Sequence, residues 1–318
     1  MARRALEPVD FPFFDYRRLT FSLGIVAGRS VWLSGSTAVR FDPQQKAMVV
    51  AGDLVAQAGV IFDKMRAVLA ASQRTLGDIC RVVRYVTPAA IPDVARLDEL
   101  NETRIGSTTA VSTVVVKKLL REQALIEMEA VAGSDGLVEY PSSIFAADSA
   151  AAWAAARDML RARGAHDEQV LRTVAFAAPD AALQQDCGIA ATSALAIGSP
   201  CLVEAGARAQ IDLALAGSGG TPLVFASAEG EEGDIVQQTE GAYRSLGQRL
   251  ERAGTGLDAV VKTTEFITQE GLADYRRTAD VRRALFSPPY PAATGVICDR
   301  LSSPSALIAV EAVAMRGM

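Results

Sequence analysis

Residues 52–69 read GDLVAQAGVIFDKMRAVL, and residues 233–250 read GDIVQQTEGAYRSLGQRL. The two stretches are offset by 181 residues, and the identical pairs at that offset are Gly52/Gly233, Asp53/Asp234, Val55/Val236, Gln57/Gln238 and Leu69/Leu250. Apolar residues in the first stretch recur at helical spacing, and Asp53 stands where an N-cap residue accepts backbone amides. The pattern predicts two equivalent helices in a duplicated chain.

A strand follows each helix at the same offset, CRVVRYVT at 80–87 and VKTTEFIT at 261–268. A third copy lies between them, with a helix that Asp148 and Ser149 can cap and the strand VLRTVAFA at 170–177. Equivalent positions of the three strands, at intervals of 91 and 90 residues, hold Arg81, Arg172 and Lys262, and also Tyr85, Phe176 and Phe266. Matching residue types at a constant period favour repeated units over a chance succession of helices and strands.

Each copy continues in the same order. A second helical segment is expected at 92–104, 179–197 and 271–285, and a closing strand at 124–133, 209–217 and 306–314. An apolar hairpin opens the first copy at 22–35 and a shorter equivalent opens the third at 222–230, whereas the middle copy keeps only 136–145. We therefore expect an α+β fold of three β-β-α-β-α-β-β units, at 1–134, 135–217 and 218–318, with the middle unit trimmed.

Composition sets the class of protein. The 318 residues are 50% hydrophobic and 22% charged, as in globular proteins, and the net charge is −5. That balance argues against nucleic acid as a partner, because non-specific binding to phosphates needs a basic face. No window approaches the roughly 18 uninterrupted apolar residues of a membrane span, and the N-terminus does not have the pattern of a secretory signal. We expect a cytoplasmic protein that does not bind membranes.

The cysteines and histidine exclude the common metal sites. Cys80, Cys187, Cys201 and Cys298 are far apart and form no C-x-x-C pair, and His166 is the sole histidine. Nitrogen and sulfur ligands therefore cannot be assembled into a zinc or iron site. We expect reduced, mostly buried thiols and no metal or cofactor.

The order of motifs resembles the Rid/YjgF family of reactive-intermediate (imine and enamine) deaminases. The segments that carry the resemblance are WLSGS at 32–36, GDLVAQ at 52–57, LGDICRVVRYVT at 76–87, IEMEAVA at 126–132 and YPAATGV at 290–296. The resemblance implies chorismate-mutase-like units that trimerise through their sheets around a three-fold axis, with ligand sites between adjacent units. A chain with three units is then expected to form a single-chain pseudo-trimer as a monomer, with self-association left open.

The resemblance also implies a catalytic carboxylate. Family deaminases use the first glutamate of an I-E-I-E strand to handle a proton or water, and the matching residue here is Glu127, followed by Glu129. The equivalent pairs are Gln210 and Asp212 in the second unit and Ala309 and Glu311 in the third. Only the first unit therefore keeps the carboxylate at the proposed catalytic position.

The family's carboxylate-binding arginine is missing, since Val111 and Ala293 occupy its place. Cations that could substitute are Arg104, Lys117, Lys118, Arg121, Arg208 and Arg300. The family pattern further nominates a set of substrate-binding residues: Gly35 and Ser36 at the hairpin turn, Asp98 in place of a family asparagine, Thr113, Glu129, Cys298 and Arg300.

Three functions are consistent with these residues. The leading hypothesis is a divergent Rid-type enzyme that hydrolyses a small imine, enamine or related reactive intermediate, with Glu127 as general acid and base. The second is a chorismatase-like hydrolysis or elimination on a small carboxylated substrate, which would require several cations in one cleft. The third is a non-catalytic ligand-binding or scaffold protein.

Overall fold

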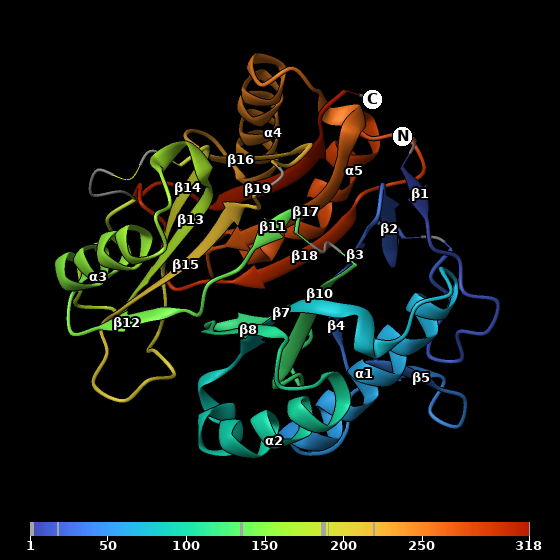
Figure 1. Ribbon diagram of the computed structural model, residues 1–318. Coiled ribbons are helices and arrows are strands. Elements are labelled where there is room, and N and C mark those ends of the chain that lie inside the picture. The colour runs from blue at the N-terminus through green and yellow to red at the C-terminus, as the bar shows by residue number, and fades with distance from the viewer. Residues whose placement is uncertain are drawn as a thin grey trace.

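Three β-sheets face the centre of the molecule, and helices cover their outer sides (Figure 1). This arrangement comes from a computed structural model, which describes residues 3–17, 19–133, 136–185, 189, 191–218 and 220–317. Helices α1 (Leu54–Ala70) and α2 (Val94–Ile105) cover the first sheet, α3 (Ser149–Ala162) the second, and α4 (Ile235–Arg252) and α5 (Thr278–Leu285) the third.

The three sheets share one strand order. In the first sheet it is β1 (Arg4–Ala5), β2 (Gly24–Ala27), β3 (Ser30–Leu33), β10 (Ile126–Ala132), β7 (Ile79–Val86) and β8 (Ala110–Val115), and β4 (Ser36–Thr37) also pairs with β10. In the second it is β11 (Val138–Glu139), β15 (Ala209–Ala216), β13 (Val170–Ala177) and β14 (Ser193–Gly198), with β12 (Ile144–Ala146) on β15. In the third it is β16 (Leu223–Glu229), β19 (Ile308–Met315), β17 (Val260–Ile267), β18 (Ala292–Ile297) and β9 (Lys118–Leu119).

Each sheet thus places the closing strand beside the strand that follows the first helix, and that strand pairs in parallel with the next one. A small hairpin of β5 (Arg40–Asp42) and β6 (Ala47–Val49) stands apart from the three sheets. The expected α+β class is confirmed.

The helix starts expected from the sequence are also confirmed. The side chains of Asp53 and Asp148 each accept one backbone amide at the first turn of α1 and α3. Asp234 accepts two at the start of α4. The repeated Gly-Asp therefore marks the same structural event in the first and third copies.

Two local predictions were wrong. Residues 179–197 do not form the expected second helix, because Ser193–Gly198 is strand β14 and the described residues before it are turns and loop. The alternating sequence SALAIG pairs with β13, and this pairing overrides the high alanine content. In the third sheet the described residues form a single opening strand, β16, where a short hairpin was expected.

Residues at the constant period meet on the central axis. The ring centroids of Tyr85 and Phe266 are 6.4 Å apart, and those of Phe176 and Phe266 are 6.2 Å apart. These rings belong to a buried cluster with contributions from all three sheets. The repeated aromatic position is therefore the place where the three copies pack together.

The repeated cations close a ring between the sheets. Arg81 on β7 pairs with Asp212 on β15 at 3.7 Å. Arg172 on β13 pairs with Glu311 on β19 at 2.7 Å, and Lys262 on β17 pairs with Glu129 on β10 at 2.8 Å. Each sheet offers its cation to the carboxylate of the next, as in a closed trimer. This geometry supports the pseudo-trimer inferred from the repeat. The division at 1–134, 135–217 and 218–318 stays a prediction.

Of the described cysteines, Cys298 is buried, whereas Cys80 and Cys201 are half-buried, so the expectation of mostly buried thiols was wrong for these two. Cys187 lies outside the described residues. No helix in the described part of the chain combines the length and apolar character needed to cross a bilayer.

Candidate functional site

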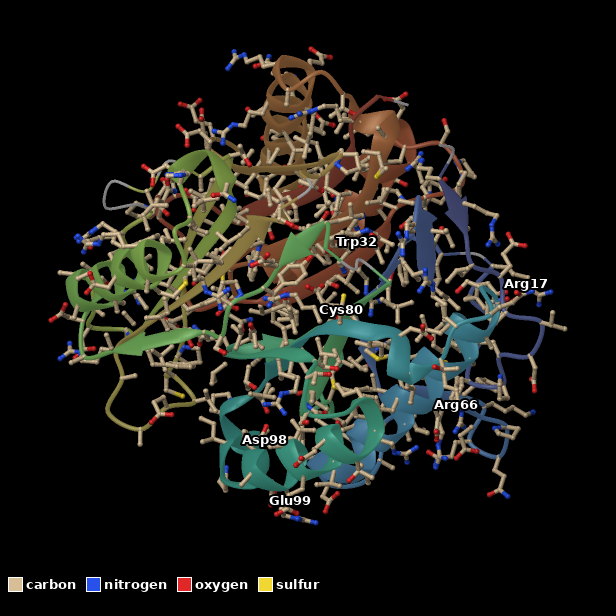
Figure 2. All side chains as sticks on the ribbon, in the orientation of Figure 1. Arg17, Trp32, Arg66, Cys80, Asp98 and Glu99 are labelled. Carbon is tan, nitrogen blue, oxygen red and sulfur yellow. The ribbon has the colours of Figure 1, made fainter. Side chains whose placement is uncertain are left out.

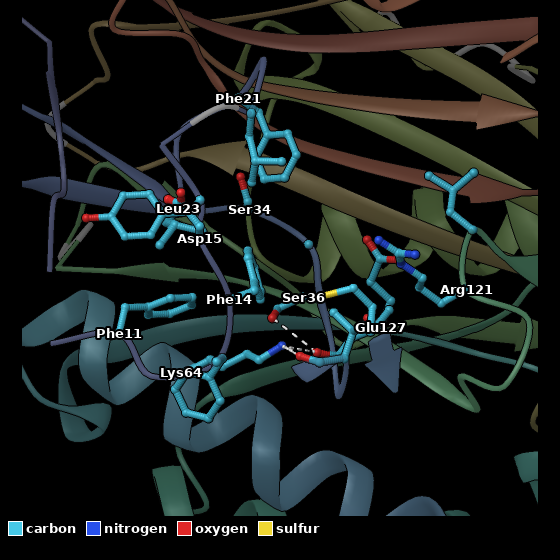
Figure 3. Close-up of a pocket in the computed structure, with 18 of the residues that line it drawn as sticks. Phe11, Phe14, Asp15, Phe21, Leu23, Ser34, Ser36, Lys64, Arg121 and Glu127 are labelled. Carbon is cyan, nitrogen blue, oxygen red and sulfur yellow. Dashed lines mark hydrogen bonds between the residues drawn. The ribbon is translucent and has the colours of Figure 1, made fainter. Parts of the chain in front are cut away.

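A cleft of about 1680 Å³ opens where the first and third sheets meet. Its lining comes from an aromatic N-terminal segment (residues 8–17), the turn around β4 with the β5–β6 hairpin, α1, β10, Leu120 and Arg121, and residues from 272 to 282 at α5. Figure 3 shows Phe11, Phe14, Lys64 and Glu127 grouped around it. The first unit's carboxylate therefore lies in a cleft between units, where the family resemblance placed the ligand.

Glu127 lies on β10 opposite Thr37 and Tyr85 and is 6% exposed. Burial, together with the neighbouring Glu129, raises the pKa of Glu127 to about 8, although the cations Lys262 and Lys64 oppose the shift. At neutral pH the carboxyl group is therefore mostly protonated and can donate a proton into the cleft.

Gly35 and Ser36 line the same cleft. The Gly35 amide donates to the Ala293 carbonyl at 3.0 Å and to Thr294 Oγ1 at 2.9 Å. A Cβ atom at Gly35 would lie 2.2 Å from Glu127 Oε1, so only glycine allows this close approach. The amide is engaged across the unit boundary, and Gly35 acts by making room for Glu127.

Glu129 stands behind Glu127 and does not line the cleft. Its carboxylate accepts from Lys262 at 2.8 Å, from the Tyr85 hydroxyl at 3.2 Å and from Thr294. Burial alone would raise the pKa of Glu129, but Lys262 and these hydrogen bonds outweigh it and hold the pKa below its ordinary value. Glu129 therefore remains ionised and ties the first sheet to the third.

Two other predicted residues form a separate group. Arg84 pairs with Asp98 at 2.7 Å and donates from Nε to Thr113 Oγ1 at 2.9 Å. The Asp98 side chain is 60% exposed, and Figure 2 shows it on α2 at the outer surface. Neither Asp98 nor Thr113 lines the cleft of Glu127.

Cys298 and Arg300 lie at the junction of the second and third units. Cys298 is 1% exposed, and burial raises the pKa of its thiol to about 12, so it is held as an unreactive thiol. The Arg300 guanidinium donates to the carbonyls of Ala178 and Ala181 at 3.1 and 2.7 Å. Neither residue lines the cleft.

Lys64 is a cleft residue that the sequence reasoning missed. It is 2% exposed on the buried face of α1, and its ammonium group lies 5.0 Å from the Phe14 ring centroid. Burial, together with the nearby Arg121, lowers the pKa of Lys64 to about 7, although Glu127 opposes the shift. The available signal was its spacing, since Lys64 falls three residues after Ile61 and four before Val68 on an otherwise apolar face.

Arginines also line the cleft. Arg282 is committed to Glu265 at 2.9 Å, and Glu265 in turn accepts from the Tyr275 hydroxyl. Arg121 and Arg276 line the cleft as well, and neither guanidinium makes a hydrogen bond or ion pair with any described residue. Of the six cations that could substitute for the family arginine, Arg121 is the one that reaches the described cleft wall.

The equivalent positions in the other units have lost this chemistry. Gln210 is fully buried and donates to Asp212 Oδ1 at 3.1 Å, and Ala309 has no polar side chain. A carboxyl group at this strand position therefore exists in the first unit alone, as the sequence indicates.

The raised pKa of Glu127 predicts a pH-dependent stability. Between pH 4.5, its ordinary pKa, and about 8, the folded protein holds a proton that the unfolded chain releases. The contribution of Glu127 to stability is thus fully present below pH 4.5 and is lost as the pH rises through 8. We expect the melting temperature of Glu127→Gln to exceed that of the wild type by a margin that grows from pH 5 to pH 8. A margin that is constant over this range in scanning calorimetry would contradict the shift.

Comparison with known sequences gives one family. The model of the family described as Endoribonuclease L-PSP matches residues 17–134 and 207–316, and residues 135–206 lie outside both segments. Protein DfrA of Myxococcus xanthus is 35% identical over 137 residues, which are 42% of this chain and 98% of that protein. A RutC family protein of Pyrococcus horikoshii is 27% identical over 112 residues, 35% of this chain and 85% of the relative.

Solved structures of the same kind align with part of the chain. E. coli TdcF with bound serine is 22% identical with a TM-score of 0.34, covering 41% of this chain and 98% of that one. Yeast Mmf1 is also 22% identical, with a TM-score of 0.35 and coverage of 42% and 98%.

Proposed function

The chain belongs to the Endoribonuclease L-PSP family and so to the Rid/YjgF superfamily, and we propose that it hydrolyses a small imine or enamine in the cleft at Glu127. The observation that supports this most directly is a buried carboxyl group whose pKa of about 8 keeps it protonated at neutral pH. A general acid or base works best when its pKa lies near the working pH.

The proposed reaction converts C=N and water into C=O and ammonia. Glu127 donates its proton to the imine nitrogen, which makes the carbon electrophilic. The resulting carboxylate then accepts a proton from water as the water oxygen bonds to that carbon. The carbinolamine collapses as its hydroxyl proton is lost, its nitrogen is protonated and ammonia leaves. An enamine enters the same sequence after protonation at carbon.

The walls of the cleft support this chemistry. Aromatic side chains of the N-terminal segment cover one side, including Phe11, Phe13 and Phe14, and limit access of water to the intermediate. Arg121 and Arg276 supply uncommitted guanidinium groups, which suit a substrate carboxylate in place of the missing family arginine.

The test is ammonia release from imines generated in situ. An amino-acid oxidase converts an amino acid to its 2-imino acid, and the rate of ammonia formation is measured with and without the protein. We expect acceleration for carboxylated imines. Release at the solvent rate from carboxylated imines and from matched neutral imines would exclude the proposed function and favour a non-catalytic binding protein.

We expect Arg121 and Arg276 to contribute to the affinity for a carboxylated substrate. Arg121→Gln and Arg276→Gln should each raise KM for a carboxylated imine about tenfold, with kcat nearly unchanged, because a charge-assisted hydrogen bond in the bound state is lost. Arg208→Gln is the matched control, since Arg208 pairs with Asp180 at 2.5 Å away from the cleft. Steady-state kinetics that give equal KM values for all three variants would contradict this role.

A chorismatase-like reaction is the second candidate, and the two unpaired arginines are the observation that favours it. Two guanidinium groups in one cleft suit a dicarboxylate better than a monocarboxylate. Pyruvate formation from chorismate would support this candidate over imine hydrolysis, and its absence in an assay with active imine turnover would exclude it.

A further inference from the structure

Lys64 is a buried amine in the wall of the cleft. Its Nζ donates to the backbone carbonyl of Thr37 at 2.7 Å and to that of Val39. Within the part of the chain that the structure describes, Lys64 makes no ion pair. The side chain lines the cleft, and Figure 3 shows it at the same end as Glu127.

The hydrogen-bond count matches the neutral amine. A neutral amine has two N–H groups and one lone pair, whereas an ammonium ion has three N–H groups. Two carbonyls satisfy the neutral form completely, but the ammonium form leaves one N–H without a described acceptor. Burial also lowers the pKa of Lys64 to about 7, so about half of the molecules carry the free amine at neutral pH.

Lys262 provides the contrast within the same chain. It is 5% exposed, but its Nζ lies 2.8 Å from the Glu129 carboxylate and also contacts Thr294. The two buried lysines therefore differ in partner: Lys262 pairs with a carboxylate, whereas the acceptors of Lys64 are two backbone carbonyls. A desolvated lysine in an apolar pocket is a common form of activated amine nucleophile.

We propose that Lys64 is a nucleophile that forms a Schiff base with an aldehyde or 2-oxo acid entering the cleft. The amine attacks the carbonyl carbon, a C–N bond forms, and proton transfer from nitrogen to oxygen gives a carbinolamine. Glu127 donates its proton to the hydroxyl, the C–O bond breaks, water leaves, and an iminium ion remains beside the Glu127 carboxylate. Hydrolysis reverses these steps and restores the free amine.

The aromatic segment fits the cationic product of this step. The Lys64 nitrogen lies 5.5 Å from the Phe13 ring centroid and 5.0 Å from that of Phe14. Ring faces at these distances stabilise a cation, and the iminium form of the Schiff base carries a positive charge on this nitrogen. The same two rings shield the iminium carbon from bulk water, since both line the cleft.

Reductive trapping tests this inference directly. The wild type is incubated with glyoxylate and sodium cyanoborohydride at pH 7, and the modified residues are identified by peptide mass mapping. The other four lysines of the chain, Lys46, Lys117, Lys118 and Lys262, serve as internal standards. We expect Lys64 to be modified at least about tenfold faster than the others, because a lysine of ordinary pKa has little free amine at pH 7. Its rate should rise with pH through about 7.

Modification that follows exposure, with Lys46 and Lys118 labelled first and Lys64 unmodified, would overturn the inference. Lys64→Met should lose the fast label, and Lys64→Arg, which keeps a cation without a nucleophile, should lose it too. If either variant fails to fold, the mapping and pH profile of the wild type still decide. The inference goes beyond imine hydrolysis, and the two proposals can be tested independently. Labelling of Lys64 without imine hydrolysis would exclude only the proposed function. Imine hydrolysis without labelling of Lys64 would exclude only the Schiff base.

Discussion

Glu127→Gln is expected to lower kcat for imine hydrolysis by about 10²- to 10⁴-fold, because the amide cannot donate a proton to nitrogen or accept one from water. The wild-type carboxyl group is mostly neutral at pH 7, since burial raises its pKa to about 8. The glutamine therefore matches its charge and volume at the reaction pH. KM and the fold should change little, and the loss should lie in kcat measured by ammonia release.

Glu229→Gln is the matched control for this loss. Glu229 is a half-buried carboxyl group at the end of β16, where it accepts the amides of Ser302 and Ser303, and it does not line the cleft. Its variant should keep the wild-type kcat. The wild-type rate should also fall above about pH 8, as the protonated form of Glu127 disappears. A wild-type kcat in Glu127→Gln would remove Glu127 from the chemistry.

The sequence predicted best what depends on local pattern or on the repeat. Asp53, Asp148 and Asp234 cap helices because an N-cap needs only its own first turn. The cations of the central ring of ion pairs stood out in the sequence because they recur at a constant period, and equivalent positions of three copies face the same axis. The family resemblance identified Glu127 as the candidate carboxylate, but its burial in a cleft depends on packing between sheets.

The sequence could not predict which side chains converge from different units. Arg282 and Tyr275 reach the cleft from the third unit, about 150 residues along the chain from Glu127, and no local spacing encodes that approach. Asp98 lies at a position that the family resemblance nominates, but its carboxylate pairs with Arg84 and does not line the cleft of Glu127. Charged side chains at motif positions are therefore weak evidence until their partners are known.

Arg172→Met is expected to lower the free energy of unfolding by about 3–5 kcal/mol, because it leaves a buried carboxylate without its counter-ion. Arg172 and Glu311 are both nearly fully buried, and Arg172 Nε lies 2.7 and 2.8 Å from the two carboxylate oxygens. The pair joins the second sheet to the third. Urea denaturation followed by circular dichroism measures the loss.

The double variant Arg172→Met with Glu311→Leu should be markedly more stable than either single variant, since apolar side chains replace both charges. The exposed pair of Arg208 and Asp180 gives the comparison, where Arg208→Met should cost only about 0–1 kcal/mol. A cost below about 1 kcal/mol for Arg172→Met would mean that this junction is hydrated or does not carry the ring. Because Arg172 does not line the cleft of Glu127, the kcat of Arg172→Met should equal that of the wild type at temperatures well below unfolding. Stability and the proposed chemistry would then be separable: the ion pairs of the ring would stabilise the fold, and the reaction proposed for the cleft would not depend on Arg172.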